Sequence, residues 1–402
     1  MTPQLRFPAF TDKWQLKKLG DIARVVTGST PSTADMSLYG DEFLFISPAD
    51  MNSGRYVTNT RTKLSQKGFE KSRPIPVGST LFVCIGSTIG KTAQATIECT
   101  TNQQINSVIG DDNNVDDDFV YLALSRLSRR ISLLAGEQAV PIISKGEFQK
   151  TKLSVPSKPE QEKIAEFLTL VDERIAAGEK KLELLQKYKK GVMQKIFTQA
   201  IRFRDENGNP YPEWEKKRLG DLFDRVTDKN KENNQNVLTI SAQQGLISQT
   251  DFFSKIVAAK NVTNYFMLTM GDFAYNKSYS AGYPMGAIKK LNLYTKGIVS
   301  TLYICFRAKD SNDNDFFEQV FVYGLQDSEI EKVAQEGARN HGLLNIGVSD
   351  FFNIELTLPK SKEEQQKIAA LLIALDDKIA AEQTRLTAAK QWKKGLLQRM
   401  FI

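Results

Sequence analysis

The chain repeats itself at a spacing of about 200 residues, and this duplication limits its fold more than any other feature. Residues 14–28, WQLKKLGDIARVVTG, match residues 214–228, WEKKRLGDLFDRVTD. Residues 160–197 match residues 364–401 without a gap, with 16 identities in 38 positions. Chance similarity between two helices would not also preserve the order of the flanking motifs. The sequence therefore predicts the order domain, helix, domain, helix, with a divergent domain and a closely matched helix in each repeat.

Both matched segments carry apolar residues at alternating steps of four and three, a spacing typical of coiled-coil helices. Pro159 precedes the first helix, and Ser361 begins a capping-box-like start of the second. At 1.5 Å per residue such a helix spans about 57 Å, more than a compact domain needs. We expect the two stripes to be buried on each other; the alternative is that each helix packs only on its own domain. The expected seam residues are Ile164, Leu168, Val171, Ile175, Leu182, Ile368, Leu372, Leu375, Ile379 and Leu386.

The regions between the matched segments are rich in residues that favour strands, with Gly or Pro at the boundaries. The clearest strand-like runs are 43–48, 79–86, 236–241 and 300–306. Acidic segments at 111–119 and 309–317 occupy similar places in the two repeats, and each is expected to precede a helix. The predicted fold class is α+β, a pseudo-twofold internal repeat of two β-rich domains and two long helices. The expected boundaries are 1–157 and 200–360 for the domains, and 158–199 and 361–402 for the helices.

Composition narrows the class of protein but does not define it. A net charge of +7 and a pI near 9.0 modestly favour an anionic partner. No apolar run is long enough to span a bilayer, and the first residues do not resemble a signal peptide. Three scattered cysteines and the single histidine, His341, do not have the spacing of a zinc site. We therefore expect a cytoplasmic protein without a structural metal.

Motifs of enzymes are missing from the sequence. Residues 86–92, GSTIGKT, have one residue too few for a phosphate-binding loop, so a β-turn after a strand is expected instead. His341 has no Ser or Cys partner signature that would indicate a catalytic triad. Neither an amino-methyltransferase tetrapeptide, NPPY or DPPY, nor a dinucleotide-binding GxGxxG occurs. The sequence thus predicts a chain that is not itself an enzyme.

Four features together resemble the specificity subunits of type I restriction–modification enzymes. They are the duplicated LGD entry, the GSTPST turn at 28–33, the EQxKIA start of each helix and the [YW]KKGxxQxxF ending. The resemblance runs from Trp14 to Phe401. It implies two target-recognition domains separated by two helices that form an antiparallel coiled coil. Each domain would read one half-site of an asymmetric, interrupted DNA target, and the rigid helices would set the spacer.

The resemblance also implies partners. Two methylation subunits and two restriction–translocation subunits would supply the chemistry of S-adenosylmethionine, ATP and Mg²⁺, and no cofactor would be bound by this chain. One alternative is a coiled-coil adaptor whose β-rich domains bind proteins. Another is a separate specificity chain of a different restriction system. Basic, divergent loops favour DNA over a protein ligand.

Candidate DNA-contacting residues lie in polar loops, because bases are read by forked donors and amides and phosphates by basic side chains. The loops are 28–33, 51–63, 87–91 and 100–107 in the first domain, and 241–245, 276–290 and 337–342 in the second. The alternative for each is a solvated loop or a structural amide. The candidate residues are Thr30, Ser32, Arg61, Lys91, Gln103, Lys277, Ser278, Tyr279, Tyr283, Lys289 and Arg339.

Basic residues also cluster toward the ends of both helices. They include Lys187, Lys189 and Lys190 in the first helix, and Lys393 and Lys394 in the second. A favourable interaction with the helix dipole, contact with DNA and docking of a methylation subunit on each half are all open interpretations.

Overall fold

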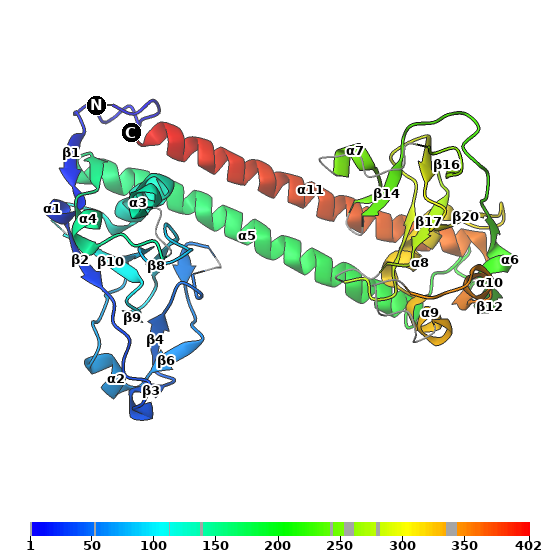
Figure 1. Ribbon diagram of the computed structural model, residues 1–402, viewed down its shortest axis with the longest axis horizontal. Helices are drawn as coiled ribbons and strands as arrows, with labels where there is room; N and C mark the ends of the chain where they lie inside the picture. Colours follow the sequence, from blue (N-terminus) through cyan, green and yellow to red (C-terminus); the bar gives the residue numbers. More distant parts are fainter. Residues whose placement is uncertain are drawn as a thin grey trace. The chain divides into compact units, whose positions relative to one another are not determined.

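The computed structural model describes residues 2–51, 54–111, 113–136, 140–241, 244–252, 261–278, 282–334 and 344–402. The chain divides into two compact units. Unit 1 comprises residues 1–180 and 383–402, and unit 2 comprises residues 181–382. Because both boundaries fall inside the long helices, each unit contains one β-rich domain, part of one long helix and part of the other (Figure 1).

Within its described residues, unit 1 contains a five-stranded sheet, a four-stranded sheet and a strand pair. The five-stranded sheet has the order β2-β10-β7-β8-β5, and the four-stranded sheet has the order β3-β6-β4-β9. The strands are β1 (Gln15–Lys18), β2 (Ala23–Thr27), β3 (Tyr39–Gly40), β4 (Phe43–Ile46), β5 (Tyr56–Val57), β6 (Thr62–Leu64), β7 (Thr80–Val83), β8 (Thr92–Ala95), β9 (Thr100–Thr101), β10 (Ile105–Gly110) and β11 (Lys152–Val155). The helices of this domain are α1 (Leu19–Ile22), η1 (Met36–Leu38), α2 (Gln66–Glu70), α3 (Asp117–Ser132), η2 (Leu133–Ala135) and α4 (Lys145–Gln149).

Unit 2 has a four-stranded sheet of order β13-β20-β17-β18 and three strand pairs in its described part, β12-β21, β14-β15 and β16-β19. The strands are β12 (Glu215–Arg218), β13 (Phe223–Arg225), β14 (Leu238–Ser241), β15 (Gly245–Ser248), β16 (Phe266–Thr269), β17 (Phe273–Asn276), β18 (Ala287–Lys290), β19 (Lys296–Val299), β20 (Ile304–Ala308) and β21 (Glu355–Leu358). The helices are α6 (Leu219–Leu222), α7 (Gln249–Phe252), α8 (Asn314–Tyr323), α9 (Asp327–Val333) and α10 (Val348–Phe352).

The two units share a topology that their sequences no longer display. In unit 1, β1 pairs with β11 and the sheet continues β2-β10-β7-β8; in unit 2, β12 pairs with β21 and the sheet continues β13-β20-β17-β18. Neighbours in both four-strand series are antiparallel. The repeated LGD turn forms α1 and α6, where Leu19 and Leu219 are fully buried. The sequence duplication is therefore a duplication of structure.

Three of the four strand-like runs lie on strands of the structure, namely β4, β7 and β14. The run at 300–306 is only partly correct, because the strand begins at Ile304 and residues before it form a turn. Both acidic segments precede a helix as expected. Asp116 accepts a hydrogen bond from the backbone N–H of Phe119 at the start of α3, and Asp313 does the same for Phe316 at the start of α8. Acidic N-caps of this kind satisfy otherwise unpaired helix N–H groups.

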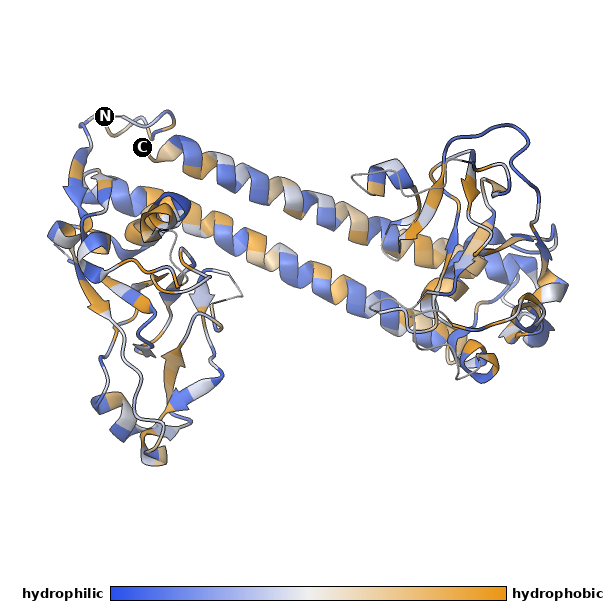
Figure 2. Cartoon of the chain, viewed as in Figure 1, coloured by the Kyte–Doolittle hydropathy of each residue, from blue (hydrophilic) through white to orange (hydrophobic). Residues whose placement is uncertain are grey.

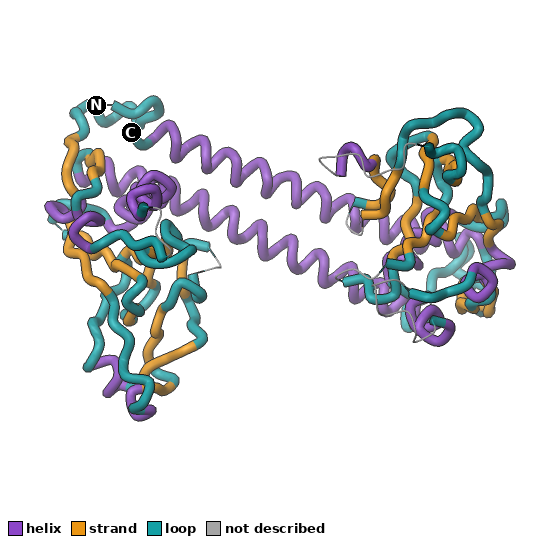
Figure 3. Tube along the Cα trace, in the orientation of Figure 1, coloured by secondary structure: helices purple, strands orange, loops and turns teal. Residues whose placement is uncertain are grey.

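The long helices are α5 (Lys158–Phe197) and α11 (Lys362–Met400), each unbroken in Figure 3. Pro159 does not precede α5 but lies in its first turn, where a proline has no N–H to leave unpaired. Ser361 caps α11 by accepting a hydrogen bond from the N–H of Glu364. Apolar residues recur along both helices (Figure 2). The parts of the two helices that lie in unit 1 run antiparallel. Asp172 of α5 contacts Lys393 of α11, whereas Glu179, further along α5, contacts Lys390, which comes earlier in α11.

The repeated Glu-Gln pair explains why the start of each long helix is so similar. Glu160 is fully buried and receives hydrogen bonds from Arg6 at 2.7 Å and from the Trp14 indole at 3.2 Å. Glu364 receives the equivalent bonds from Arg202 and Trp214 in unit 2. We call these two arrangements the Glu–Arg–Trp clamps. A buried carboxylate needs such partners, because an unpaired charge in the interior is strongly unfavourable.

The glutamine that follows each clamp joins three parts of its unit. In unit 1, the Gln161 side chain accepts from the N–H of Asp116 and donates to the carbonyl of Pro156. In unit 2, Gln365 makes the same two bonds with Asp313 and Pro359. The helix start, the acidic segment and the last strand of each domain are thereby held together.

The predicted seam residues are shared between two kinds of packing. Ile164, Leu168 and Val171 join the core of unit 1, which also contains Leu396 and Met400 from α11. Ile368, Leu372 and Leu375 join the core of unit 2 with the end of α5. Ile175, Leu182 and Ile379 are half-buried, and Leu386 is buried. Within each unit, the core therefore includes residues of the domain and of both long helices.

Candidate nucleic-acid interface

Strand direction gathers the candidate loops of unit 1 at one edge of the five-stranded sheet. Chain segments leave that edge after β2 and β7, and enter it before β10, β8 and β5. The segments concerned are 28–33, 86–91, 102–104 and the described part of 47–55. We call this edge, with its loops, reading edge 1. Candidates far apart in the sequence are thus neighbours in space.

Hydrogen bonds tie these loops to one another. The Thr30 hydroxyl donates to the Gln103 side chain at 2.5 Å, which joins two candidate residues directly. The Lys91 ammonium donates to the carbonyl of Pro48 at 3.4 Å, and the backbone N–H of Arg61 donates to Asp50. Ser32, Arg61 and Gln103 are exposed, whereas Lys91 is half-buried.

Gly28 allows the first of these loops to lie against the third. A Cβ on Gly28 would stand 2.2 Å from the Asn102 carbonyl oxygen and 2.3 Å from that of Thr101. The next residue, Ser29, donates its N–H to the same Thr101 carbonyl. Only glycine fits this approach, so Gly28 of the GSTPST turn is a structural requirement of reading edge 1.

The GSTIGKT segment is a hairpin turn between β7 and β8. Gly86 and Gly90 both have φ of +94°, a region that favours glycine. No helix follows the segment, so the arrangement of a phosphate-binding loop is not formed. The β-turn expectation is confirmed, and Lys91 is left at the edge of the sheet.

The corresponding edge of the sheet in unit 2 carries the described candidates of the second domain. Residues 277–286 connect β17 to β18, in the place that the GSTIGKT turn occupies in unit 1, and we call this edge reading edge 2. The backbone carbonyl of Lys277 accepts a hydrogen bond from the N–H of Leu344. Ser278 is half-buried, and its N–H donates to Asn276. Lys289 lies 5.0 Å from the ring centre of Tyr283. Tyr279 and Arg339 lie outside the described residues, as does His341.

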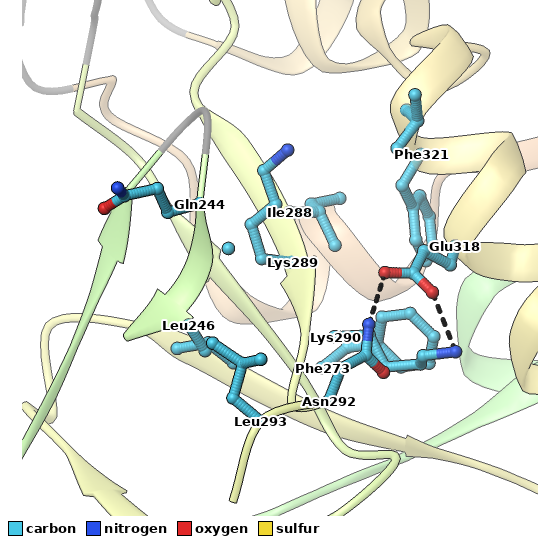
Figure 4. A pocket seen from close by; sticks show the side chains of 12 residues that line it. Gln244, Leu246, Phe273, Ile288, Lys289, Lys290, Asn292, Leu293, Glu318 and Phe321 are labelled. Atoms are coloured by element: carbon cyan, nitrogen blue, oxygen red, sulfur yellow. Dashed lines mark hydrogen bonds and ion pairs between the residues drawn. The ribbon is translucent and has the colours of Figure 1, made fainter. Parts of the chain in front are cut away.

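A cavity of about 240 Å³ opens beside Lys289, between the start of β15, strand β18 and α8. Figure 4 shows Lys290 and Asn292 directed at Glu318, with distances of 2.8 Å and 2.7 Å. Burial disfavours the charged form of Lys290, but hydrogen bonds to Asp315 and Glu318 outweigh this and raise the pKa of its ammonium group. The charge of Lys290 is therefore compensated by Asp315 and Glu318. Lys289 beside it is the better candidate for binding an anionic ligand.

The acidic segments lie at the opposite edge of each sheet. Residues 111–116 follow the end of β10, and residues 309–313 follow the end of β20, whereas the reading edges lie where these strands begin. Negative charge near phosphate is unfavourable. The expectation that these segments face away from DNA is compatible with this arrangement.

Two members of the basic clusters have carboxylate partners on the opposite long helix, and Lys187 pairs with Glu183 of its own helix. Lys189 is buried and lies 2.6 Å from Asp376, and Lys393 pairs with Asp172. Each lysine belongs to one helix and each aspartate to the other, at equivalent positions of the two repeats. These two lysines are therefore occupied by pairing between helices. Lys190 and Lys394 are exposed.

Sequence reasoning missed the most elaborate polar site of unit 1, which is centred on Arg55. Its side chain is only 4% exposed, although arginine is rarely buried. The guanidinium lies among Gln94, Asp118, Thr169 and Asp172. No repeated partner or local motif marks Arg55 in the sequence. The clamps, by contrast, could have been found, because Arg6 and Arg202 both stand in a repeated Arg-Phe pair.

No group of three or more metal-ligating side chains occurs among the described residues. Cys84, Cys99 and Cys305 are free and buried, and burial raises the pKa of each thiol to about 12. No helix within the described parts of the chain is long and apolar enough to cross a membrane.

Comparison with known proteins finds one family in both repeats. The family described as Type I restriction modification DNA specificity domain matches residues 11–187 and 211–391. The MjaIX type I restriction enzyme specificity subunit of Methanocaldococcus jannaschii is 29% identical over 223 residues, 52% of this chain and 51% of that protein. The HindI specificity subunit of Haemophilus influenzae is 33% identical over 150 residues, 36% of this chain and 32% of that protein. The regions matched by this chain thus cover about half or less of the length of each of these relatives.

Solved structures show the same fold at low sequence identity. The S subunit of the type-I restriction-modification system from M. genitalium has a TM-score of 0.62 and 17% identity, covering 100% of this chain and 99% of that one. A chain from a structure on complex assembly and conformational transition of the type I R-M system has a TM-score of 0.55 and 15% identity, covering 97% and 98%. The mixed arrangement of helices and strands is therefore one that known proteins share.

Proposed function

Because this chain belongs to the type I restriction modification DNA specificity family, we propose that it is the DNA sequence-specificity subunit of a type I restriction–modification enzyme. The observation that carries the proposal is the pair of reading edges. Both are built on one topology, β2-β10-β7-β8 and β13-β20-β17-β18, yet they present different side chains. Two different surfaces on one scaffold suit a target with two different half-sites.

In this proposal each reading edge reads one half-site from polar and basic loops. The Thr30–Gln103 pair, Arg61 and Lys91 serve the first half-site, and the described candidates Lys277, Ser278, Tyr283 and Lys289 serve the second. Amides and hydroxyls suit base edges, while lysine and arginine suit both phosphates and guanine. Tyr279 and Arg339 stay candidates on sequence grounds.

We further propose that α5 and α11 form an antiparallel coiled coil that sets the spacer between the half-sites. Support comes from the apolar repeat of both helices and from the equivalent pairs Lys189–Asp376 and Lys393–Asp172. A rigid helix converts residue number into length at about 1.5 Å per residue. The domain boundaries at 1–157, 158–199, 200–360 and 361–402 belong to this proposal.

The chain supplies placement in this scheme, and its partners supply catalysis. Two methylation subunits and two restriction–translocation subunits would bring S-adenosylmethionine, ATP and Mg²⁺, with no cofactor on this chain. Support for two copies of one partner comes from Tyr188 and Trp392, which occupy equivalent positions and are 62% and 54% exposed. Exposed aromatic residues are favoured at protein interfaces. Each stands immediately before the repeated Lys-Lys-Gly.

The experiment is a binding selection with the complex of this chain and its methylation subunits. A randomised DNA library is incubated with the complex at several salt concentrations, and bound sequences are read. We expect two defined half-sites separated by a spacer of fixed length, with affinity that falls steeply as salt rises. Enrichment of a single continuous site would contradict the bipartite reading. Absence of any sequence preference would contradict the specificity function itself.

A further inference from the structure

We infer that Arg55 is a positioning residue for DNA reading by unit 1: it fastens reading edge 1 to helix α5, so that the base-reading loops keep one orientation. The inference rests on the proposed function, because it assumes that reading edge 1 contacts DNA. It adds a residue that no sequence pattern marks and assigns it a role in the fidelity of one half-site.

Arg55 stands where the edge segment enters the sheet. It directly precedes β5, which pairs in parallel with β8, and its carbonyl accepts the N–H of Gln94 at 2.7 Å. Its Nε donates to the side chain of the same Gln94 at 2.8 Å. Gln94 is 1% exposed and donates in turn to the Gly78 carbonyl and to Asp118. The arginine is therefore fixed to the sheet by backbone and side chain together.

The far end of the guanidinium reaches the long helix. Nη1 donates to the Thr169 hydroxyl at 2.8 Å and lies 3.8 Å from Oδ2 of Asp172. That oxygen is buried and has no hydrogen-bond partner of its own. Nη2 lies 2.6 Å from Asp118 as an ion pair without hydrogen-bond geometry. One side chain thus bridges the sheet, the start of α3 and α5.

Aromatic rings and opposite charges make this burial tolerable. The guanidinium carbon lies 4.9 Å from the ring centre of Tyr56 and 4.7 Å from that of Tyr121. Burial raises the pKa of both phenols, so the rings are neutral at ordinary pH. Asp172 also pairs with Lys393 of α11. A planar group with several donors fits this site, whereas the compact ammonium of lysine cannot reach all these partners at once.

The chain around Arg55, from Ser47 to Arg61 in its described part, contacts or contains candidate DNA-contacting residues. Asp50 accepts the N–H of Arg61 with one oxygen and the N–H of Ser47 with the other, which ties together both ends of the segment. Lys91 donates to the carbonyl of Pro48 on the same segment. A displacement of Arg55 would therefore shift Arg61 and Lys91 relative to the rest of reading edge 1. Bases are discriminated by hydrogen bonds that weaken steeply with distance and angle.

Unit 2 provides an internal comparison. Its central sheet has the order β13-β20-β17-β18, so none of the described strands of unit 2 occupies the place of β5. Asp172 forms an ion pair with Arg55 at 3.8 Å, whereas Asp376, at the equivalent position, receives a hydrogen bond from Gln319 of α8. Among the described residues, the Arg55 site therefore occurs in unit 1 without a counterpart in unit 2, and its loss should affect only the first half-site.

The test uses the full chain assembled with its methylation subunits. Variant R55K keeps the positive charge but loses the planar fork, and R24K, at an exposed arginine of β2, is the matched control. Methylation is measured on a library of sites with single mismatches in either half-site. We expect R55K to raise methylation of first-half mismatches relative to the intact site by about tenfold, with second-half discrimination unchanged. R24K should match the wild type.

A second variant keeps the inference testable if R55K does not fold. T169V preserves the shape of the side chain and leaves Arg55 and its charged partners in place, while it removes the hydroxyl that accepts from Nη1. We expect a change of about threefold in the same direction. Unaltered first-half discrimination in every variant that folds, or an equal loss at both half-sites, would overturn the inference. A wild-type complex without any half-site preference would instead overturn the proposed function, and this inference with it.

Discussion

Asp172 and Asp376 occupy the same position in the two repeats, yet they lie in different surroundings. Asp172 is 16% exposed in its side chain and faces two cations, Arg55 and Lys393. Asp376 is 45% exposed and faces one cation, Lys189, and the amide of Gln319. Duplication has preserved the pairing between helices, whereas the link from helix to sheet has diverged. The parts that resemble each other hold the scaffold together, and the parts that differ surround the reading edges.

The largest expected effect comes from separating the halves along the scaffold. An insertion of four helix-forming residues near Ala177 lengthens α5 by about one turn, or 5.4 Å. We expect the target spacer to change by about one or two base pairs, because base pairs are about 3.4 Å apart, and both half-sites to persist. Sequencing of methylated sites measures the spacer and both half-sites. Altered half-sites with an unchanged spacer would refute the role of the helices in spacing.

Next in size is the loss of a Glu–Arg–Trp clamp. E160Q or E364Q leaves a half-buried arginine and a buried indole without their carboxylate, and we expect each to destabilise its own unit by about 3 kcal/mol. Urea unfolding with pulsed thiol labelling separates the units, since Cys84 and Cys99 report on unit 1 and Cys305 on unit 2. E162Q, at an exposed neighbour, is the control. Because the clamps are equivalent, a large effect in one unit alone would speak against this comparison.

Smaller and unequal effects are expected where the halves have diverged. D172N should destabilise unit 1 by about 2 kcal/mol, because buried Arg55 and half-buried Lys393 lose their carboxylate. D376N should cost about 1 kcal/mol in unit 2, since solvent screens its more exposed carboxylate. The same labelling experiment measures both. E173Q and D377N, exposed residues one position further on, are matched controls. Equal losses in the free energy of unfolding for D172N and D376N would mean that the ion pair with Arg55 adds no stability to unit 1.

The smallest expected effect concerns single lysines at the reading edges. K91Q and K277Q should each weaken DNA binding about threefold and reduce the slope of log affinity against log salt by about one unit. Titrations at several salt concentrations measure this slope. K152Q, on strand β11 and outside the loops that form either reading edge, should leave it unchanged. A lysine variant that keeps the wild-type slope would remove that residue from the phosphate contacts.

Sequence alone reached the architecture because the informative signals are local or repeated. The apolar spacing of residues such as Ile164 and Leu168 follows from helix geometry, and the duplicated motifs revealed the order of domains and helices. The family match in both repeats confirms the resemblance. Acidic caps before α3 and α8 were predictable for the same local reason.

The site was harder to predict because its contacts join residues distant in the chain. The Thr30–Gln103 and Arg55–Thr169 bonds depend on how the sheet is assembled, which no local pattern encodes. For Lys189 and Lys393 the sequence left three interpretations open: interaction with the helix dipole, contact with DNA and docking of a methylation subunit. None of them was the ion pair between helices that the structure shows. The DNA contacts themselves stay predictions.

The core of unit 1 includes residues from distant parts of the chain, with a consequence for synthesis on the ribosome. Phe401 stacks on Phe119 at 5.3 Å and meets Trp14 edge-on, and the N–H of Leu5 donates to the carbonyl of Arg399. The whole of unit 2 is translated between these partners, which takes on the order of 10 to 40 s. During that interval the first half of the nascent chain exposes an apolar surface, and a chaperone that shields it would raise the yield of folded protein.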